Sequence, residues 1–142
     1  DLGHDKSPTM AARMLTLFAV LHDSLHQENE SNPRIHPFTS KIRRRLAGLP
    51  KAVESPRELA ELIGEDLSSL NRKVRNDSGL NLGTLIDERR LELSYAALKA
   101  GKLPISQIAW NTGFQDPNYF SRWFRKKVGQ TPLQWRNSAN LD

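Results

Sequence analysis

Residues 108–131, with the sequence "IAWNTGFQDPNYFSRWFRKKVGQT", repeat the pattern of residues 59–81, "LAELIGEDLSSLNRKVRNDSGLN". Each copy has a short apolar segment, a glycine, and then a longer segment in which apolar and basic residues recur at helical spacing. The copies are 49 positions apart up to the turn glycine and 50 positions apart from Leu70 and Phe120 onward, so the second turn is one residue longer. A short helix, a glycine turn and a longer amphipathic helix form a helix-turn-helix. The repeat therefore predicts two such motifs in an all-α chain.

Capping signals locate the helices in and around the repeat. Residues 55–58 (SPRE) and 131–134 (TPLQ) have the spacing of a capping box, and Asp66 and Asp116 are further N-cap candidates. Gly101 is expected to end one long helix that connects the two copies. The expected elements are a helix at about 38–47, a first helix-turn-helix at about 56–79, a connecting helix at about 82–100 and a second helix-turn-helix at about 104–129. The residues expected to be buried in the connecting helix are Leu85, Ile86, Leu93, Ala96, Ala97 and Leu98.

The first 37 residues carry a separate pattern. Residues 8–27 are predicted to form a helix, because Pro8 suits the first helical position and apolar residues recur at spacings of three and four. Residues 28–37 are polar, contain two prolines and are predicted to be a linker. The apolar stripe of residues 10–25 could pack against the rest of the chain, against an absent domain, or against a second copy in a dimer. His22 and His26 stand one helical turn apart, but no third ligand accompanies them, so no metal site is expected.

The composition is typical of a globular chain, since 37% of the 142 residues are hydrophobic and 26% are charged. The absence of cysteine excludes disulfides and thiolate metal sites. No apolar run reaches the roughly 18 residues of a membrane span, and a cytoplasmic protein that does not enter a membrane is expected. Residues 1–40 have a net charge of −2 and residues 41–142 a net charge of +7, which favours a polyanionic partner for the second part.

The longer helix of each copy has one apolar face and one polar face. The two polar faces correspond at the offset of 50 positions, and both contain arginine, asparagine or serine. Arginine can donate two hydrogen bonds to guanine, asparagine can bond adenine, and serine can bond bases or phosphates. For one such helix a solvated surface would be the simpler interpretation, but two matching faces after two glycine turns favour binding to duplex DNA. The matched pairs are Ser68 and Asn118, Asn71 and Ser121, Arg72 and Arg122, and Arg75 and Arg125, with Lys126 and Lys127 as flanking candidates for phosphate contacts.

The connecting helix sets the distance between these two faces. Its 19 residues would span about 28 Å at roughly 1.5 Å per residue, and successive major-groove segments on one side of B-DNA are about 34 Å apart. Two recognition helices, at about 66–77 and 116–127, are therefore expected in adjacent major-groove segments. Because the connecting helix is shorter than the DNA repeat, we expect the DNA to bend, at a cost on the order of 1–6 kcal/mol.

The run "ISQIAWNTGFQDPNYFSRWFRKKVGQTPLQWR" (residues 105–136) resembles the C-terminal signature of the AraC/XylS family of bacterial transcription regulators. That signature has Ile-Ala, Gly-Phe, Phe-Ser-Arg, Phe-Lys/Arg and Gly, followed by Pro and a Tyr/Trp-Arg ending. Residues 59–79 are similar to the family's first helix-turn-helix and residues 89–101 to its connecting helix, so the resemblance covers about residues 38–138. The departures lie in the first half, where Val74 replaces the usual Phe, Ser94 the usual Ala and Asp66 a common Ser.

The resemblance implies a sequence-specific binding domain for double-stranded DNA over residues 38–142, in which one helix of each motif enters the major groove. It also implies an activator that contacts RNA polymerase and a preceding effector-binding or dimerisation domain. Residues 1–37 are too few to form such a domain and are expected to be its tail and linker. No cofactor is expected. The implied base contacts are Ser68, Asn71, Arg72, Asn118, Tyr119, Ser121 and Arg122, and the implied phosphate contacts are Arg75, Arg125 and Lys126.

Two other classes of function compete with transcription regulation. DNA-alkylation repair proteins can carry a similar module and accept methyl groups on cysteine, but this chain has no cysteine, so that chemistry is excluded. The four histidines lie outside the core motifs and form no evident triad, and no enzyme activity is expected. A basic helical module that binds an acidic protein stays open, and a salt titration of duplex binding would distinguish it. The residues expected to pack in the core or at its rim rather than stack on bases are Trp110, Trp123 and Trp135, and Phe114 is likewise expected to be structural.

Overall fold

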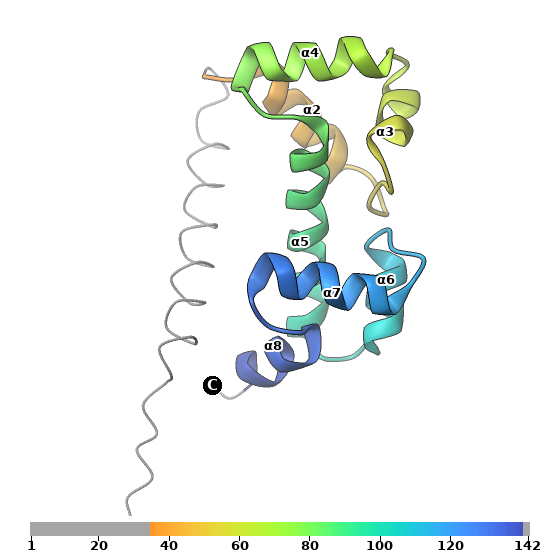
Figure 1. The fold of residues 1–142 in the computed structure, drawn as a ribbon, viewed down its shortest axis with the longest axis vertical. Helices are drawn as coiled ribbons and strands as arrows, with labels where there is room; N and C mark the ends of the chain where they lie inside the picture. Colours follow the sequence, from red (N-terminus) through yellow and green to blue (C-terminus); the bar gives the residue numbers. More distant parts are fainter. Residues whose placement is uncertain (1–34, 141–142) are drawn as a thin grey trace, which may run out of the picture. The chain divides into compact units, whose positions relative to one another are not determined.

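The structure, a computed structural model, describes residues 35–140, which belong to one compact unit, residues 32–142. This part of the chain contains seven helices and no strand, so the predicted all-α fold is confirmed (Figure 1). The expectations for the helix at residues 8–27, for dimerisation through residues 10–25 and for the His22–His26 pair lie outside the described residues. The helices are α2 (Pro37–Ala47), α3 (Pro56–Ile63), α4 (Leu67–Ser78), α5 (Leu82–Ala100), α6 (Ile105–Asn111), α7 (Pro117–Val128) and α8 (Pro132–Ala139).

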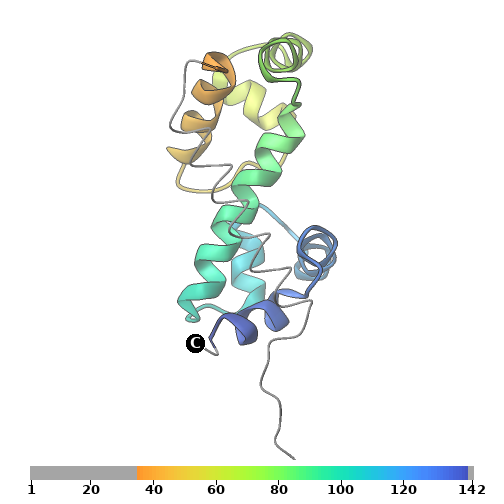
Figure 2. The same ribbon diagram turned by 90° about the vertical axis from the view of Figure 1, so that its left-hand side faces the viewer.

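The described helices form two helix-turn-helix motifs joined by α5, which has the predicted bounds. In the first motif α3 packs on α4, and in the second α6 packs on α7. The remaining two helices support them, since α2 packs against α4 and α5 while α8 packs against α5 and α7. Figures 1 and 2 agree in placing α4 and α7 on the same side of α5, toward its two ends, with roughly parallel axes.

The core of the first motif is aliphatic. Leu70 and Val74 of α4 are fully buried, as the predicted apolar stripe of this helix requires. They pack with residues from α2, α3 and the first half of α5, so the motif is completed by helices on both sides of it in the sequence. The buried members of this core are Ile42, Leu46, Val53, Leu59, Ala60, Leu70, Val74, Leu82, Leu85 and Ile86.

The core of the second motif is aromatic. Phe120 and Phe124 of α7 are fully buried with ring centroids 5.9 Å apart, and the Phe114 ring lies 5.3 Å from Phe120. Tyr95 of α5 extends this cluster, because its ring lies 5.8 Å from Phe124 and 5.0 Å from Trp135. Burial raises the pKa of Tyr95 to about 12. Tilted and edge-on ring pairs contribute stabilising free energy in addition to that gained by burying their apolar surface. A few large rings can therefore form the core of the second motif.

Side-chain caps begin the helices largely as predicted. Ser55 caps α3 by accepting a hydrogen bond of 3.2 Å from the Glu58 N–H. The carboxylate of Glu58 does not return a bond to Ser55 but accepts one of 2.6 Å from the N–H of Glu54. The predicted capping box at residues 55–58 is therefore only half formed, because its acidic member binds the incoming loop instead. The other predicted caps are confirmed, namely Asp66 of α4, Asp116 of α7, and Thr131 of α8 in a complete capping box with Gln134.

The buried face of α5 differs from the prediction in the middle of the helix. Leu91 and Ser94 are buried, whereas Ala96 is exposed. Ser94 tolerates burial because its hydroxyl donates a hydrogen bond of 2.6 Å to the carbonyl of Arg90. The helix packs on different neighbours along its length, so a single apolar stripe does not describe it. Of the other predicted positions, Leu85, Ile86 and Leu98 are buried and Leu93 and Ala97 are half-buried.

The start of α2 is held by the end of α4. His36 precedes α2 without a side-chain cap of its own, and the N–H of Thr39 donates instead to the Asp77 carboxylate at 2.8 Å. The Thr39 hydroxyl donates to the Ser78 hydroxyl at 2.8 Å, and the His36 ring Nδ1 lies 2.6 Å from the Asp77 carbonyl oxygen. Burial acts to raise the pKa of Asp77, but the hydrogen bonds from Thr39 outweigh it and hold that pKa below its ordinary 3.8.

Replacing Asp77 by asparagine keeps an acceptor oxygen for the Thr39 N–H but removes the negative charge at the start of α2, so it is expected to lower the free energy of unfolding by about 0.3–1 kcal/mol at neutral pH. The folded-state pKa of Asp77 is depressed, so the contribution of its charge is present above the unfolded pKa and is lost as the pH falls through the folded pKa. The free energies of unfolding of the protein and of Asp77→Asn, measured with urea, should therefore differ at pH 7, begin to approach each other near the ordinary pKa of 3.8, and converge only below the depressed folded-state pKa. Glu61→Gln, which neutralises an exposed carboxylate of α3, is the control. An Asp77→Asn difference that persists unchanged in acid would contradict the role of the charge.

Candidate nucleic-acid interface

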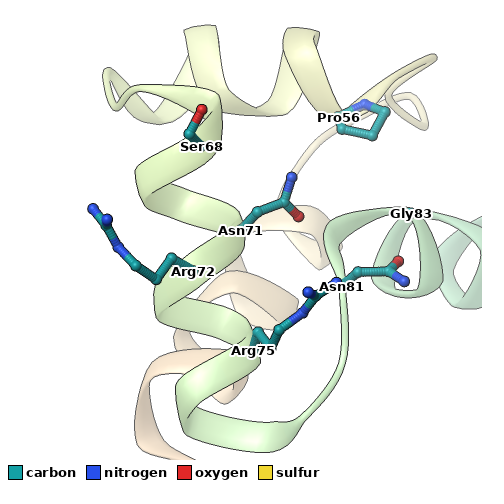
Figure 3. Close-up of a pocket in the computed structure, with 7 residues that line it drawn as sticks. All are labelled: Pro56, Ser68, Asn71, Arg72, Arg75, Asn81 and Gly83. Atoms are coloured by element: carbon teal, nitrogen blue, oxygen red, sulfur yellow. The ribbon is translucent and has the colours of Figure 1, made fainter.

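The four predicted residues of the first motif line one hollow beside α4 (Figure 3). Its volume is about 480 Å³, and no carboxylate lines it. In the view of Figure 3 Asn71 and Arg75 extend toward the side on which α3 and α5 begin, while Arg72 extends away from that side. Two guanidinium groups and two helix starts give this hollow a positive potential, which suits an anion such as a phosphate. The lining residues are Pro56, Ser68, Asn71, Arg72, Arg75, Asn81 and Gly83.

Asn71 lines the hollow and also forms a hydrogen bond within the protein. Its Oδ1 accepts a hydrogen bond of 3.2 Å from the N–H of Leu82, the first residue of α5. The N-cap of that helix, Asn81, accepts from the N–H of Thr84, so Asn71 satisfies a second free N–H at the same helix start. The oxygen of Asn71 is thereby engaged, and only its Nδ2 group is left to donate to a ligand.

The predicted residues of the second motif lie along α7. Asn118, Tyr119 and Arg122 are exposed, and Ser121 is half-buried. Tyr119 is 54% exposed although its ring packs on Phe114 with centroids 5.8 Å apart, so the residue stays accessible while part of its ring is held by the aromatic core. The opposite face of α7 is the aromatic core, which holds the polar residues outward.

Five basic side chains on α4 and α7 carry unpaired charge. Within residues 35–140 they form no side-chain hydrogen bond or ion pair, whereas other basic residues of the same helices do. Lys73 pairs with Glu65 at 2.9 Å, and Lys127 pairs with Asp87 of α5 at 3.2 Å. Lys127, which the sequence suggested as a flanking phosphate contact, thus has its ammonium group next to α5 in this structure, and its contact with phosphate stays a prediction. The unpaired and exposed basic residues are Arg72, Arg75, Arg122, Arg125 and Lys126.

The aromatic residues that are not on α7 behave largely as structural groups. Phe114 is 4% exposed and Trp135 is half-buried, in keeping with the expected packing role. Trp110 is 54% exposed, and the Lys51 ammonium lies 4.5 Å from its ring centre, which fits the rim position allowed by the prediction. It lies at the rim of the protein rather than in the core.

Comparison with known proteins gives the family. A family model described as a helix-turn-helix domain matches residues 59–138, which run from within α3 to within α8. The HTH-type transcriptional activator RhaR of Enterobacter sp. (strain 638) is 33% identical over 142 residues, which cover 98% of this chain and 50% of that protein. The chain belongs to the AraC/XylS family of transcription regulators. This confirms the resemblance found in the sequence.

Solved structures of AraC/XylS-type domains have the same fold. The C-terminal domain of AraT, a response regulator from Geobacillus stearothermophilus, matches with a TM-score of 0.63 at 25% identity, over 74% of this chain and 88% of that one. The DNA-binding domain of AdpA, a global transcriptional factor solved in complex with a target DNA, matches with a TM-score of 0.59 at 19% identity, over 72% and 91%. The second likeness concerns the fold alone. The chain spans half or less of the length of the curated relatives that it matches.

The family matched over residues 59–138 is one of DNA-binding transcription regulators and not of enzymes. Among residues 35–140 there is no group of three or more His, Cys, Asp or Glu side chains that could hold a metal ion. None of the helices described here is long and apolar enough to cross a membrane.

Three residues around the hollow were not predicted for the AraC/XylS interface. Pro56 begins α3, Asn81 caps α5, and Gly83 is in the first turn of α5. The helix start at Pro56 was predicted from the sequence, but the cap Asn81 and Gly83 were not, and the proximity of all three to α4 depends on how α3 and α5 pack against it. The sequence did contain one indication of this proximity. The start of α3 precedes α4 and the start of α5 follows it closely, and each helix start carries free N–H groups that can lie near the basic face of α4.

Proposed function

We propose that this chain is the sequence-specific, double-stranded-DNA-binding part of a bacterial transcription regulator, and that α4 and α7 enter adjacent major-groove segments. The observation that carries the proposal is the matched placement of unpaired basic side chains on these two helices, which lie on the same side of α5 (Figure 2). Membership in the AraC/XylS family supports it. Two such faces held by one connecting helix suit a duplex, which offers the same groove twice on one side.

The roles of the individual residues follow from their position and chemistry. Arg72 and Arg122 are exposed without partners and can donate two bonds each to a guanine. Arg75 lines the hollow beside the start of α5, a setting that favours a phosphate. Arg125 and Lys126 lie one turn further along α7 than Arg122 and suit phosphates at the groove edge. The remaining proposed base contacts are Ser68, Asn71 through its Nδ2, Asn118, Tyr119 and Ser121.

The length of α5 supports bending of the bound DNA. Its 19 residues span about 28 Å at roughly 1.5 Å per residue, less than the separation of about 34 Å between successive major-groove segments. A straight duplex would not meet both helices equally well. A bend toward the protein removes this mismatch at a cost on the order of 1–6 kcal/mol, which the second set of contacts offsets.

The wider assignment rests on the relatives. We assign DNA binding to residues 38–142 and regard residues 1–37 as the tail and linker of an effector-binding or dimerisation domain. RhaR is named as a transcriptional activator. We therefore include in the proposal that this protein activates transcription by contacting RNA polymerase, and that it does so in the cytoplasm. Dimerisation through residues 10–25 belongs to the same proposal.

Selection of bound sequences from a random duplex library tests the function directly. The expected product is a site with two preferred blocks about one helical turn apart, one for each motif. A single preferred block would assign recognition to one motif. Enrichment of no sequence, together with capture of acidic proteins, would instead favour the basic protein-interaction module.

Phosphate contacts are tested by the salt dependence of binding. Each contact contributes about one to the slope of log affinity against log salt concentration, so Arg125→Ala/Lys126→Ala is expected to lower that slope by about two on any duplex. The matched control is Lys41→Ala/Arg44→Ala, which removes the same charge from exposed positions of α2, on the other side of α5 in Figure 2. Titrations of both variants by fluorescence anisotropy measure the slopes. Equal slopes for the two variants would mean that only the net charge matters.

A further inference from the structure

Arg90, near the middle of α5, contacts both helix-turn-helix motifs. Its Nη2 donates a hydrogen bond of 2.6 Å to the carbonyl of Glu54, in the loop between α2 and α3 of the first motif. The same nitrogen lies 3.5 Å from the carbonyl of Gly113, in the turn of the second motif. The guanidinium carbon stands 4.6 Å from the ring centre of Phe114. One side chain of α5 thus contacts segments of both motifs.

The turn glycines of the two motifs differ in what surrounds them. Gly64 and Gly113 occupy equivalent turns and have φ angles of +78° and +89°, which favour glycine. A Cβ atom on Gly64 would meet nothing within 4 Å. A Cβ atom on Gly113 would lie 3.2 Å from the carbonyl oxygen of Val53 and 3.3 Å from that of Ala52. The second turn therefore lies directly against the backbone of the first motif's loop, and the first turn has no such neighbour.

Two exposed contacts surround this approach. The Gln115 amide donates to the Glu54 carboxylate at 3.1 Å, and the Lys51 ammonium lies 4.5 Å from the ring centre of Trp110. We define the junction as the contact between two segments with Arg90 between them. One side is formed by residues 51–54, and the other by Trp110, Gly113, Phe114 and Gln115.

The partial burial of the Arg90 guanidinium group costs free energy of folding. Its Nε is buried without a hydrogen-bond partner in the described part of the chain, which costs free energy. Burial lowers the pKa of its guanidinium from the ordinary value, while the nearby carboxylates of Asp87 and Glu54 act in the opposite direction. A half-buried cation with a buried, unpaired Nε that bridges two subdomains is better explained by the geometry it imposes than by net stabilisation.

We propose that the junction locks the two motifs in one relative orientation, with Arg90 as its positioning residue. The protein thereby discriminates between DNA sites by the spacing between the two sequence blocks of each site. The DNA part of this inference rests on the proposed function. A helix alone can bend, and motifs packed on its two ends can rock independently. A second connection removes these motions, so the second helix finds its groove only at one spacing. Preorganisation of this kind raises the effective concentration of the second contact at that spacing alone.

The orientation can be measured without DNA in the full chain. The protein has no cysteine, so spin labels on Glu61→Cys in α3 and Ser106→Cys in α6, both exposed, report the distance between the motifs. The expected distribution is narrow for the parent protein and for Gly64→Ala, which strains a turn outside the junction. It broadens for Arg90→Ala and for Gly113→Ala. The exposed pair Lys51→Ala/Gln115→Ala, which leaves the buried residues in place, broadens it to a lesser extent and serves if Arg90→Ala fails to fold.

The spacing of the site gives the second measurement. One base pair inserted between the two selected blocks moves the second block by about 3.4 Å and rotates it by about a tenth of a turn. The insertion is expected to weaken binding of the parent protein and of Gly64→Ala by about a hundredfold, and that of the junction variants by about tenfold or less. An unchanged narrow distribution in all junction variants would overturn the lock. Retained discrimination in variants with broadened distributions would overturn its role in spacing. If the parent protein selects no DNA sequence, the proposed function fails, and the spin-label result still decides the lock.

Discussion

Replacing Phe120 by alanine is expected to destabilise the domain by about 3–5 kcal/mol, the usual cost of truncating a buried phenylalanine. Phe120 is fully buried, and its ring contacts three others, those of Phe114 at 5.3 Å, Trp123 at 6.3 Å and Phe124 at 5.9 Å. The cavity would open at the centre of the aromatic core, where large rigid rings cannot move together to fill it. A small domain has a total stability of only about 5–15 kcal/mol, so this one truncation would remove a large fraction of it.

Urea unfolding followed by circular dichroism measures this loss. Leu133→Ala is the matched control, because Leu133 is 55% exposed on the neighbouring helix α8 and its truncation should cost less than about 0.5 kcal/mol. Leu70→Ala, at the equivalent position of the first motif and also fully buried, should cost about 2–5 kcal/mol. A loss under about 1 kcal/mol for Phe120→Ala would mean that the aromatic core is not what holds α7 in place.

The double variant Arg72→Ala/Arg122→Ala is expected to weaken binding to the selected site by about 2–6 kcal/mol. Each arginine contributes about 1–3 kcal/mol of discrimination if it bonds a guanine. Arg72 and Arg122 belong to different motifs, so their effects should add. Both side chains are exposed and form no ion pair within residues 35–140, so removing them leaves no buried partner unsatisfied and should leave the fold unchanged.

Comparison of two DNAs separates base contacts from phosphate contacts. The two single variants and the double variant are titrated with the selected duplex and with a random duplex at one salt concentration, with Arg44→Ala as the control for lost charge. Base contacts predict a large loss on the selected duplex and a small loss on the random one. Equal losses on both would assign these arginines to phosphates. An effect of Arg122→Ala without any effect of Arg72→Ala would assign recognition to the second motif alone.

The helices could be predicted from the sequence because their signals are local. Apolar spacing, glycine at the turns and the caps Asp66 and Asp116 all act within one or two helical turns, and these elements formed where they were expected. The exceptions involve competing partners. Glu58 bonds Glu54 because that loop N–H is also free, and Ser94 is buried because its hydroxyl is satisfied by the helix itself.

The contacts between distant segments could not be predicted in this way. Asp77 binds Thr39 across 38 positions, and Arg90 binds Glu54 across 36. No periodicity records which polar groups will meet after packing, so both looked like ordinary charges of a solvated face. Lys127 illustrates the same limit within the site, since its position on α7 resembles that of Lys126 and only the packing of α7 on α5 brings it to Asp87.

The first core is aliphatic and the second is aromatic, so the tryptophan and tyrosine chromophores are distributed unequally between the two motifs. All three tryptophans and both tyrosines stand at or after position 95, so the first motif has neither. Intrinsic fluorescence will therefore follow the second motif and the end of α5 that packs on it, while far-ultraviolet ellipticity follows every helix. Superimposable melting curves from the two signals would mean that the motifs lose structure as one cooperative unit, and separated curves would give the order in which they melt.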